Sequence, residues 1–210
     1  MMRLSFLLCL TSLLMAQDTP KAVAGATNSN PPVYTADGRL VFPANYREWI
    51  YLTTGMDMDY NPDPKMMMGH SMFDNVFVNP DAYKAFVATG TWPDKTMLVL
   101  EGRMAANKGS INKAGHYQTN DVMMRSVHIR DESRFPGKWA FFPFDEGKPT
   151  KPISQKAECY SCHEQHGAVD TTFVQFYPTL LEVAQKKGTL APAYLKEEAA
   201  NATEGHKKAN

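Results

Sequence analysis

The chain has no excess of charge of either sign. Its 210 residues include 22 Lys and Arg and 22 Asp and Glu, which gives a formal net charge of zero. Proteins that bind nucleic acids or anionic membrane surfaces usually carry a basic patch or stripe. The balanced charge therefore gives no electrostatic reason to expect either partner. No internal repeat is visible, and with 43% hydrophobic residues the chain is long enough to form one sizeable core.

Long apolar runs are also lacking, except at the N-terminus. An apolar stretch at residues 4–15 follows Arg3 and ends at Ala16. It is too short to cross a bilayer, which takes about 20 apolar residues, and its order of segments is typical of a secretory signal peptide. We therefore expect residues 1–16 to be a signal peptide and residues 17–35, rich in Thr, Asn, Ala and Pro, to be a flexible leader. The mature protein would then be periplasmic or secreted, with no membrane span.

Cysteine is scarce, because the chain has only three. Cys9 lies in the signal segment and is expected to leave with it. The other two, Cys159 and Cys162, lie in the string ECYSCHEQHG, where His163 directly follows the second. A disulfide between them would close a very small loop and would restrict the unfolded chain little. This pair therefore suggests a chemical role more than a structural crosslink.

Three chemistries use two thiols at this spacing. A thioredoxin-like redox pair usually follows a strand of a βαβ unit, and nothing upstream indicates one. A closed zinc site needs four ligands; His166 could join His163, but no distant Cys–His pair completes the set. Covalent haem uses every residue of the motif, because Cys159 and Cys162 would lie on one helical face and add to the two vinyl groups. We therefore expect one haem c per chain, with His163 as iron ligand.

The motif lies late in the chain, whereas small electron-carrying c-type cytochromes are helical and carry it near the N-terminus. The region before it has a mixed pattern. Apolar periodicity, glycine and proline predict helices at residues 42–55 and 80–90, strands or extended segments at 73–79, 96–105, 116–131 and 138–144, a further helix at 178–187, and a polar, fraying tail at 193–210.

Four strings in this order resemble the cytochrome P-460 family: FDNVFVNPDAYKAFVATGTWPDKTMLVLEGR, GSINKAGHYQTN, FPGKWAFFPF and CYSCHEQHGAVDTTFVQFYPTLL. The resemblance covers about residues 46–190. It implies an α+β, β-rich fold in which an antiparallel sheet carries a few packed helices and the haem is held at a C-terminal Cys-x-x-Cys-His helix. We place this haem domain at residues 36–192, followed by the tail at 193–210.

The resemblance also implies a function. Its best-known members are periplasmic homodimers that oxidise hydroxylamine with a lysine cross-linked to the haem. The related cytochrome c′-β branch lacks the cross-link and binds nitric oxide and carbon monoxide. In both, the histidine of the motif, here His163, is the only protein ligand of the iron. The chain departs from the catalytic pattern at Leu100, where a lysine would be expected; Lys95, Lys108 and Lys113 lie nearby in the sequence and remain candidates.

Two functional classes follow. The first is a periplasmic mono-haem c-type cytochrome with an open distal site for hydroxylamine or nitric oxide, acting as a haem oxidoreductase or a ligand binder. The second is a six-coordinate electron-transfer cytochrome with Met or His as second ligand. The expected partners are a small ligand or substrate, a redox partner cytochrome and a second copy of the chain.

Several residues are candidates for the distal side. His116 is the first candidate for a proton donor, because its GHYQ string belongs to the family-like segment. His70 lies in a Met-rich string at residues 62–73, which is either a gap-filling loop or a source of a second ligand. His128 is expected to be structural. The rest of the distal wall is expected to be apolar, built from Phe, Met and Leu side chains.

Overall fold

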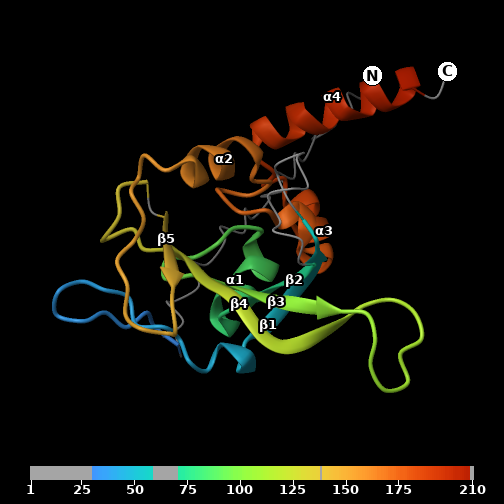
Figure 1. Cartoon of the computed structure of the whole chain (residues 1–210). Coiled ribbons are helices and arrows are strands. Elements are labelled where there is room, and N and C mark those ends of the chain that lie inside the picture. Colours follow the sequence, from blue (N-terminus) through green and yellow to red (C-terminus); the bar gives the residue numbers. More distant parts are fainter. Residues whose placement is uncertain (1–29, 59–70, 138, 209–210) are drawn as a thin grey trace, which may run out of the picture.

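The computed structural model describes residues 30–58, 71–137 and 139–208, with the side chains described as far as residue 203. It confirms the predicted β-rich α+β fold (Figure 1). The five strands form one antiparallel sheet in chain order, and they are β1 (Ile50–Met56), β2 (Met72–Val78), β3 (Met97–Ala106), β4 (Tyr117–Arg130) and β5 (Trp139–Phe144). The expected signal peptide and most of the expected leader lie outside the described residues.

Four α-helices accompany the sheet: α1 (Pro80–Thr89), α2 (Glu158–His166), α3 (Pro178–Lys187) and α4 (Pro192–Lys208). Helices α1 and α3 both begin with proline and both end at a glycine with positive φ, Gly90 at 77° and Gly188 at 68°. Proline suits the first helical turn, and glycine adopts the left-handed conformation without steric cost. The boundaries predicted from these residues are therefore close to those observed. Among the described residues, no helix is long and apolar enough to cross a membrane.

The predicted helix at residues 42–55 is wrong. Only a short 3-10 turn, η1 (Tyr46–Glu48), forms there, and β1 follows it. The β-branched residues of β1 favour a strand, and the segment pairs along its length with β2; the rings of Tyr51 and Phe77 meet edge-on with centroids 6.0 Å apart. The hydrogen bonds and side-chain contacts with β2 therefore outweigh the weak helical spacing of the apolar residues in this segment.

The polar C-terminal segment also differs from the fraying tail that we expected, because residues from Pro192 onward form α4. Its Ala-rich stretch at residues 199–202 favours a helix. Tyr194 packs into the core, and the Nδ1 atom of His166 on α2 lies 2.8 Å from the Oε2 atom of Glu197 on α4. These two contacts fix the start of α4 against the body, while its later part extends away from it (Figure 1).

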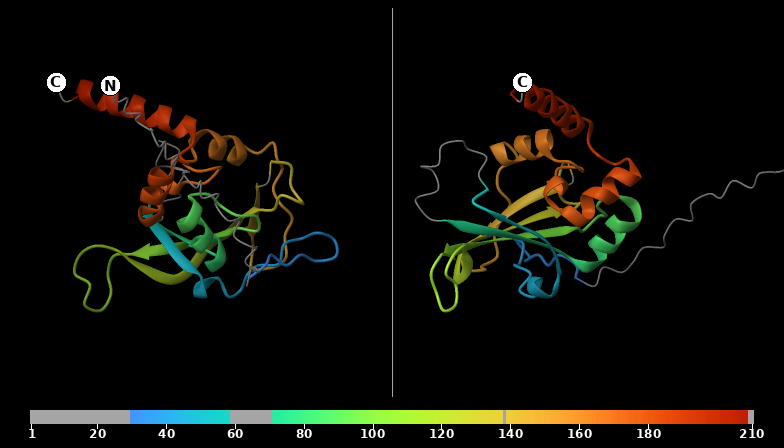
Figure 2. Two further views of the ribbon diagram at one scale, coloured as in Figure 1. Left: turned by 180° about the vertical axis from the view of Figure 1, so that it is seen from behind. Right: turned by 90° about the vertical axis from the view of Figure 1, so that its right-hand side faces the viewer.

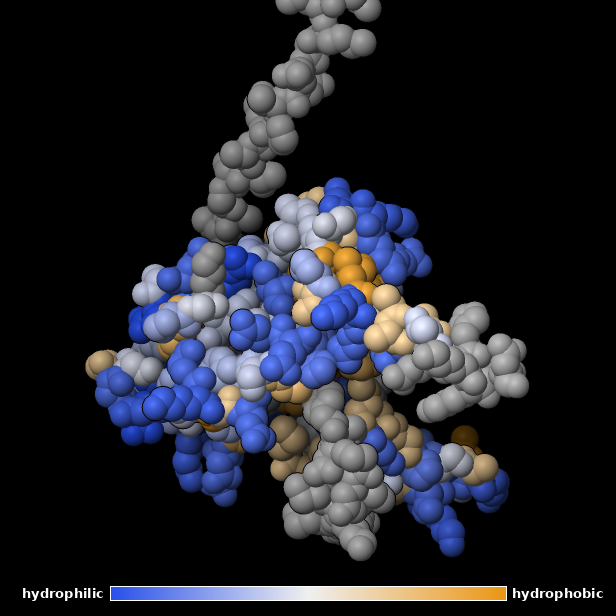
Figure 3. All heavy atoms as spheres, turned by 90° about the horizontal axis from the view of Figure 1, so that it is seen from above, coloured by the Kyte–Doolittle hydropathy of each residue, from blue (hydrophilic) through white to orange (hydrophobic). Residues whose placement is uncertain are grey.

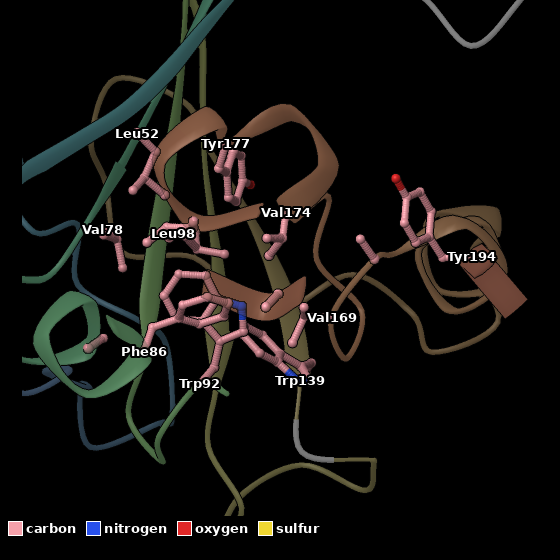
Figure 4. Close-up of a cluster of buried hydrophobic side chains, with 14 residues drawn as sticks. Leu52, Val78, Phe86, Trp92, Leu98, Trp139, Val169, Val174, Tyr177 and Tyr194 are labelled. Atoms are coloured by element: carbon pink, nitrogen blue, oxygen red, sulfur yellow. The ribbon is translucent and has the colours of Figure 1, made fainter. Parts of the chain in front are cut away.

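The sheet separates two apolar layers (Figure 2). On the back face, the segment before β1 contributes Leu40, Tyr46 and Trp49 to a core with the inward side chains of β3, β4 and β5. On the front face lie α1, α3 and residues 168–177, which pack around Phe86 and Trp92 (Figure 4). Seen from above, most of the described surface is hydrophilic (Figure 3). The front layer covers one end of the sheet, and the other end is where a cavity lies.

Candidate functional site

A cavity of about 340 Å³ lies over the front face of the sheet. Every strand contributes side chains to it, and α2 and the segment at residues 173–177 close it. Its described lining consists of Thr53, Gly55, Met58, Met72, Asp74, Val76, Leu98, Leu100, Met124, Ser126, His128, Phe141, His163, Phe173, Phe176 and Tyr177. The volume is within the range of small-molecule and cofactor sites.

The strand register explains which residues reach the cavity. Alternate residues of a strand point to the same face, so Asp74 and Val76 on β2 face the cavity together. Val76 pairs with Leu100 on β3, and Leu100 pairs with Ser126 on β4. Two residue pairs further along, on the same face, Asp74 pairs with Gly102, which pairs with Met124. The cavity wall is therefore built from rows of neighbours across the sheet.

His163 enters this cavity from α2. Its Nδ1 atom lies 2.7 Å from the carbonyl oxygen of Thr171. A carbonyl oxygen only accepts, so Nδ1 carries the proton and donates, which leaves the lone pair of Nε2 available. Burial lowers the pKa of His163 below its ordinary value of 6.5, although the bond to Thr171 opposes this. A neutral imidazole with one nitrogen held by a backbone carbonyl is the usual arrangement of a histidine that ligates a metal.

The loop that supplies the Thr171 carbonyl is held by the core. The indole Nε1 of Trp92 donates to the Oγ1 of Thr172 over 2.8 Å, and that hydroxyl donates to the carbonyl of Val169 over 2.7 Å. Gly167 permits the close approach of the loop to α2, because a Cβ atom there would lie 2.6 Å from the carbonyl oxygen of His163. The orientation of the His163 ring therefore depends on residues far from it in the sequence.

Both cysteines of the motif lie on α2 as free thiols, with Cys159 exposed and Cys162 partly buried. Burial and the neighbouring Cys159 raise the pKa of the Cys162 thiol. Within the part of the chain that the structure describes, no group of three or more His, Cys, Asp or Glu side chains could hold a metal ion. The donors that α2 offers at the cavity are thus two unbonded thiols beside the imidazole of His163, which fits a haem attached and ligated at one helix.

His128 forms the wall next to His163. Its ring stacks on Phe141 with centroids 4.0 Å apart and meets the ring of His163 edge-on at 5.1 Å. Burial, and then the proximity of His163, lower its pKa well below 6.5, so the ring is neutral. We expected His128 to be structural, and its packing agrees with that role, but it also lines the cavity.

The end of the cavity formed by β2, β3 and β4 is only partly apolar. Met72, Met124 and Leu100 agree with the expected wall, but Asp74 and Ser126 lie among them. The Oδ1 atom of Asp74 is buried without a hydrogen-bond partner among the described residues. Burial, and then the nearby Asp57, raise the pKa of Asp74 to about 6. We did not predict Asp74, although its alternation with Val76 in the strand FDNVFV was a usable signal.

His116, by contrast, is not brought to the cavity. It is exposed in the loop before β4 and is not part of the described lining. The structure therefore does not bring His116 together with His163, and its role as a distal proton donor stays a prediction. His70 lies outside the described residues.

The three candidate lysines also lie elsewhere. Lys95 precedes β3, where its ammonium group pairs with the buried Asp131. Lys108 and Lys113 are exposed in the loop between β3 and β4. Leu100, at the position where a cross-linking lysine was expected, does line the cavity.

Replacing Asp74 with asparagine is expected to change how stability depends on pH. The folded-state pKa of about 6 is above the ordinary value of 3.8, so the folded state binds the proton more tightly than the unfolded chain. This contribution is complete below about pH 4 and is lost as the pH rises through about 6. The free energy of unfolding of Asp74→Asn relative to wild type should therefore increase by about 1–2 kcal/mol between pH 4 and pH 7, allowing for the partial exposure of the group.

Urea unfolding of the haem-loaded protein at several pH values measures this difference. Asp121→Asn is the control, because Asp121 is exposed on β4 and its replacement should leave the pH profile of the wild type unchanged. Parallel profiles for Asp74→Asn and wild type would contradict the raised pKa.

Comparison with known proteins identifies the family of the chain. A sequence model of the Cytochrome P460 family matches residues 43–174. This range contains all five strands, α2 with the Cys-x-x-Cys-His motif, and the loop that holds His163. No curated protein matches the chain. Because the family model covers more than half of the 210 residues, and α2 carries the two thiols and the cavity-lining imidazole that a haem requires, the chain belongs to the cytochrome P460 family and is a haem protein.

Proposed function

We propose that the protein is a mono-haem c-type cytochrome in which Cys159 and Cys162 attach the haem through thioethers and His163 ligates the iron. The observation that carries this proposal is the hydrogen bond from His163 Nδ1 to Thr171, which leaves Nε2 free on a residue that lines the cavity. The two free thiols on the same helix complete the attachment site. When bound, the haem supplies a redox-active iron that takes small ligands.

The proposed ligands are small nitrogen species such as hydroxylamine or nitric oxide. Leu100, Val76 and Phe176 give the cavity a largely apolar wall, which favours small uncharged molecules because burying an unpaired charge is costly. Lys95, Lys108 and Lys113 are all placed elsewhere, so none of the three is proposed as a cross-link to the haem. Ligand binding and redox chemistry without that cross-link are the activities that this arrangement supports best.

An electron-transfer role is the second candidate. The thioethers of Met58, Met72 and Met124 line the cavity, and a thioether is a common second axial ligand in c-type cytochromes. This observation is weaker than the one above, because lining the cavity does not by itself make any of these thioethers a ligand. The two candidates differ in whether a ligand from solution can reach the iron.

We also propose export. Residues 1–16 contain a basic residue, an apolar stretch and a small residue in the order typical of a signal peptide. A covalently held haem also suits a compartment where lost haem is hard to replace. A redox partner cytochrome and a second copy of the chain are proposed as partners on the family resemblance alone.

N-terminal sequencing of the haem-loaded protein tests export. The sequence should start near Gln17, because the signal peptide is removed; an intact Met1 on haem-loaded protein from the cytoplasm would contradict export.

Cysteine substitutions test the attachment. In wild type, acid–acetone extraction should leave the haem on the polypeptide, because thioether bonds survive this treatment. The double variant Cys159→Ser/Cys162→Ser should release all of its haem, as measured by absorption of the extract and the mass of the polypeptide. Ser161→Ala, on the same helix between the two cysteines, is the matched control and should retain the haem. Free extraction from wild type, or stoichiometric zinc in place of haem, would refute the assignment.

Carbon monoxide tests the open side of the iron. The reduced protein should be high-spin and five-coordinate, and carbon monoxide should bind within the mixing time at micromolar concentration. Absorption and resonance Raman spectra of the reduced protein, with and without the gas, measure both properties. A low-spin spectrum that carbon monoxide leaves unchanged would instead assign the protein to the electron-transfer class.

A further inference from the structure

The end of the cavity formed by β2, β3 and β4 contains a carboxylate with no positively charged group beside it in the described lining. Asp74 is the only carboxylate among its described lining residues. The other groups beside it are the thioethers of Met72 and Met124 and the backbone of Gly102. Nothing in this lining neutralises the carboxylate when it is ionised.

Gly102 explains why the methionines lie so close to the carboxylate. A Cβ atom at residue 102 would lie 2.7 Å from Met72 Sδ, 2.7 Å from Met124 Cγ and 3.5 Å from Asp74 Oδ1. Both methionine side chains and the carboxylate therefore converge over the bare backbone of β3. Thioethers and methylene groups do not donate hydrogen bonds, so these neighbours do not solvate the charge of the carboxylate.

The Oδ1 atom of Asp74 is correspondingly buried without a partner among the described residues. Buried polar atoms without partners are rare in native proteins, and each requires an explanation such as a water molecule or a ligand. Asp74 lines the same cavity as His163. Any ligand bound opposite that histidine therefore shares the cavity with this carboxylate.

The other described groups near Asp74 are either negatively charged or neutral, so they do not compensate its negative charge. Asp57, directly after β1, accepts a hydrogen bond from the backbone N–H of Met72 over 2.8 Å, and its negative charge contributes to the raised pKa of Asp74. Gly102 and Met124, its neighbours across β3 and β4, are uncharged. His128 and His163, at the other end, are held neutral by burial. Within the described part of the chain, the field at this end of the cavity is negative.

The two arginines next to Gly102 and Met124, on β3 and β4, do not offset this charge. Arg103 belongs to the opposite face of the sheet, where its guanidinium binds Glu101 with an Nε–Oε1 distance of 2.7 Å. Arg125 also belongs to that face, where its guanidinium lies over the ring of Phe42, 5.7 Å from the centroid. Both arginines are therefore separated from Asp74 by the sheet.

We propose that Asp74 sets the charge selectivity of the cavity, so that the haem site takes uncharged small ligands and excludes anions. This inference rests on the proposed function, because it requires an iron open to external ligands. The raised pKa of about 6 means that the exclusion should develop between pH 5 and pH 7. Below that range the carboxyl group is neutral and anions should enter more easily.

Fluoride is a suitable probe for the oxidised, haem-loaded protein, because it remains an anion throughout this pH range. We expect Asp74→Asn to bind fluoride about tenfold more tightly than wild type at pH 7.5, a typical effect of one partly screened charge within the same cavity. At pH 5 the two affinities should agree within about twofold. Asp74→Glu should exclude fluoride as wild type does, and Asp121→Asn, with an exposed carboxylate removed, should match wild type at every pH.

Carbon monoxide bound to the reduced proteins separates charge from shape. It is uncharged, so its affinity should be the same in wild type, Asp74→Asn and Asp74→Glu. Equal fluoride affinities in wild type and Asp74→Asn at pH 7.5 would overturn the inference, as would a parallel loss of carbon monoxide binding in Asp74→Asn. If wild type itself fails to bind carbon monoxide, the proposed function fails instead, and that result is distinct from the other two.

Discussion

The hydrogen bond between His163 and Thr171 joins the two parts of the molecule that make the site. One partner lies on α2 with both cysteines, and the other lies on the loop that packs into the front core. Because the acceptor is a backbone carbonyl, it fixes both the tautomer and the plane of the ring. The loop is held in turn by Trp92, whose indole lies beside Phe86 with ring centroids 4.2 Å apart. The geometry of His163, the proposed iron ligand, thus depends on the packing of α1 and the segment that follows it.

The back face of the sheet packs into a core that stabilises the fold, whereas the front face lines the cavity. Residues with odd numbers on β3, such as Val99, pack into the back core, whereas Leu98 and Leu100 face the front. Glu101 is buried on the back face, where Tyr46, Arg47 and Arg103 bind its carboxylate. These hydrogen bonds and positive charges outweigh the effect of burial and lower the pKa of Glu101. Asp74 has no such partners on the front face, and its pKa moves in the opposite direction.

Much of this fold could be predicted from the sequence, and the reasons are local. Proline and glycine mark both ends of α1 and α3, and the spacing in ECYSCHEQHG indicates one helix with a haem motif. The helix expected at residues 42–55 was wrong because pairing of β1 with β2 decided its conformation. The cavity residues were harder to predict, since Asp74, Ser126 and His128 come together only through strand register. His116 lies in a family-like string, yet its loop leaves the sheet before reaching the cavity.

Burial acts on Asp74, His128 and His163 in the same physical sense, because a low-polarity environment disfavours the charged form. It lowers the pKa of His128 and His163 and raises that of Asp74. The two histidines are therefore uncharged at neutral pH, and the ordinary value for a carboxyl group is so low that the raised pKa of Asp74 still leaves it largely ionised there. The carboxyl group of Asp74 consequently changes from neutral to negative as the pH rises through about 6. Under the proposed function, a neutral imidazole at one end and a lone carboxylate at the other would distinguish ligands by charge before they distinguish them by shape.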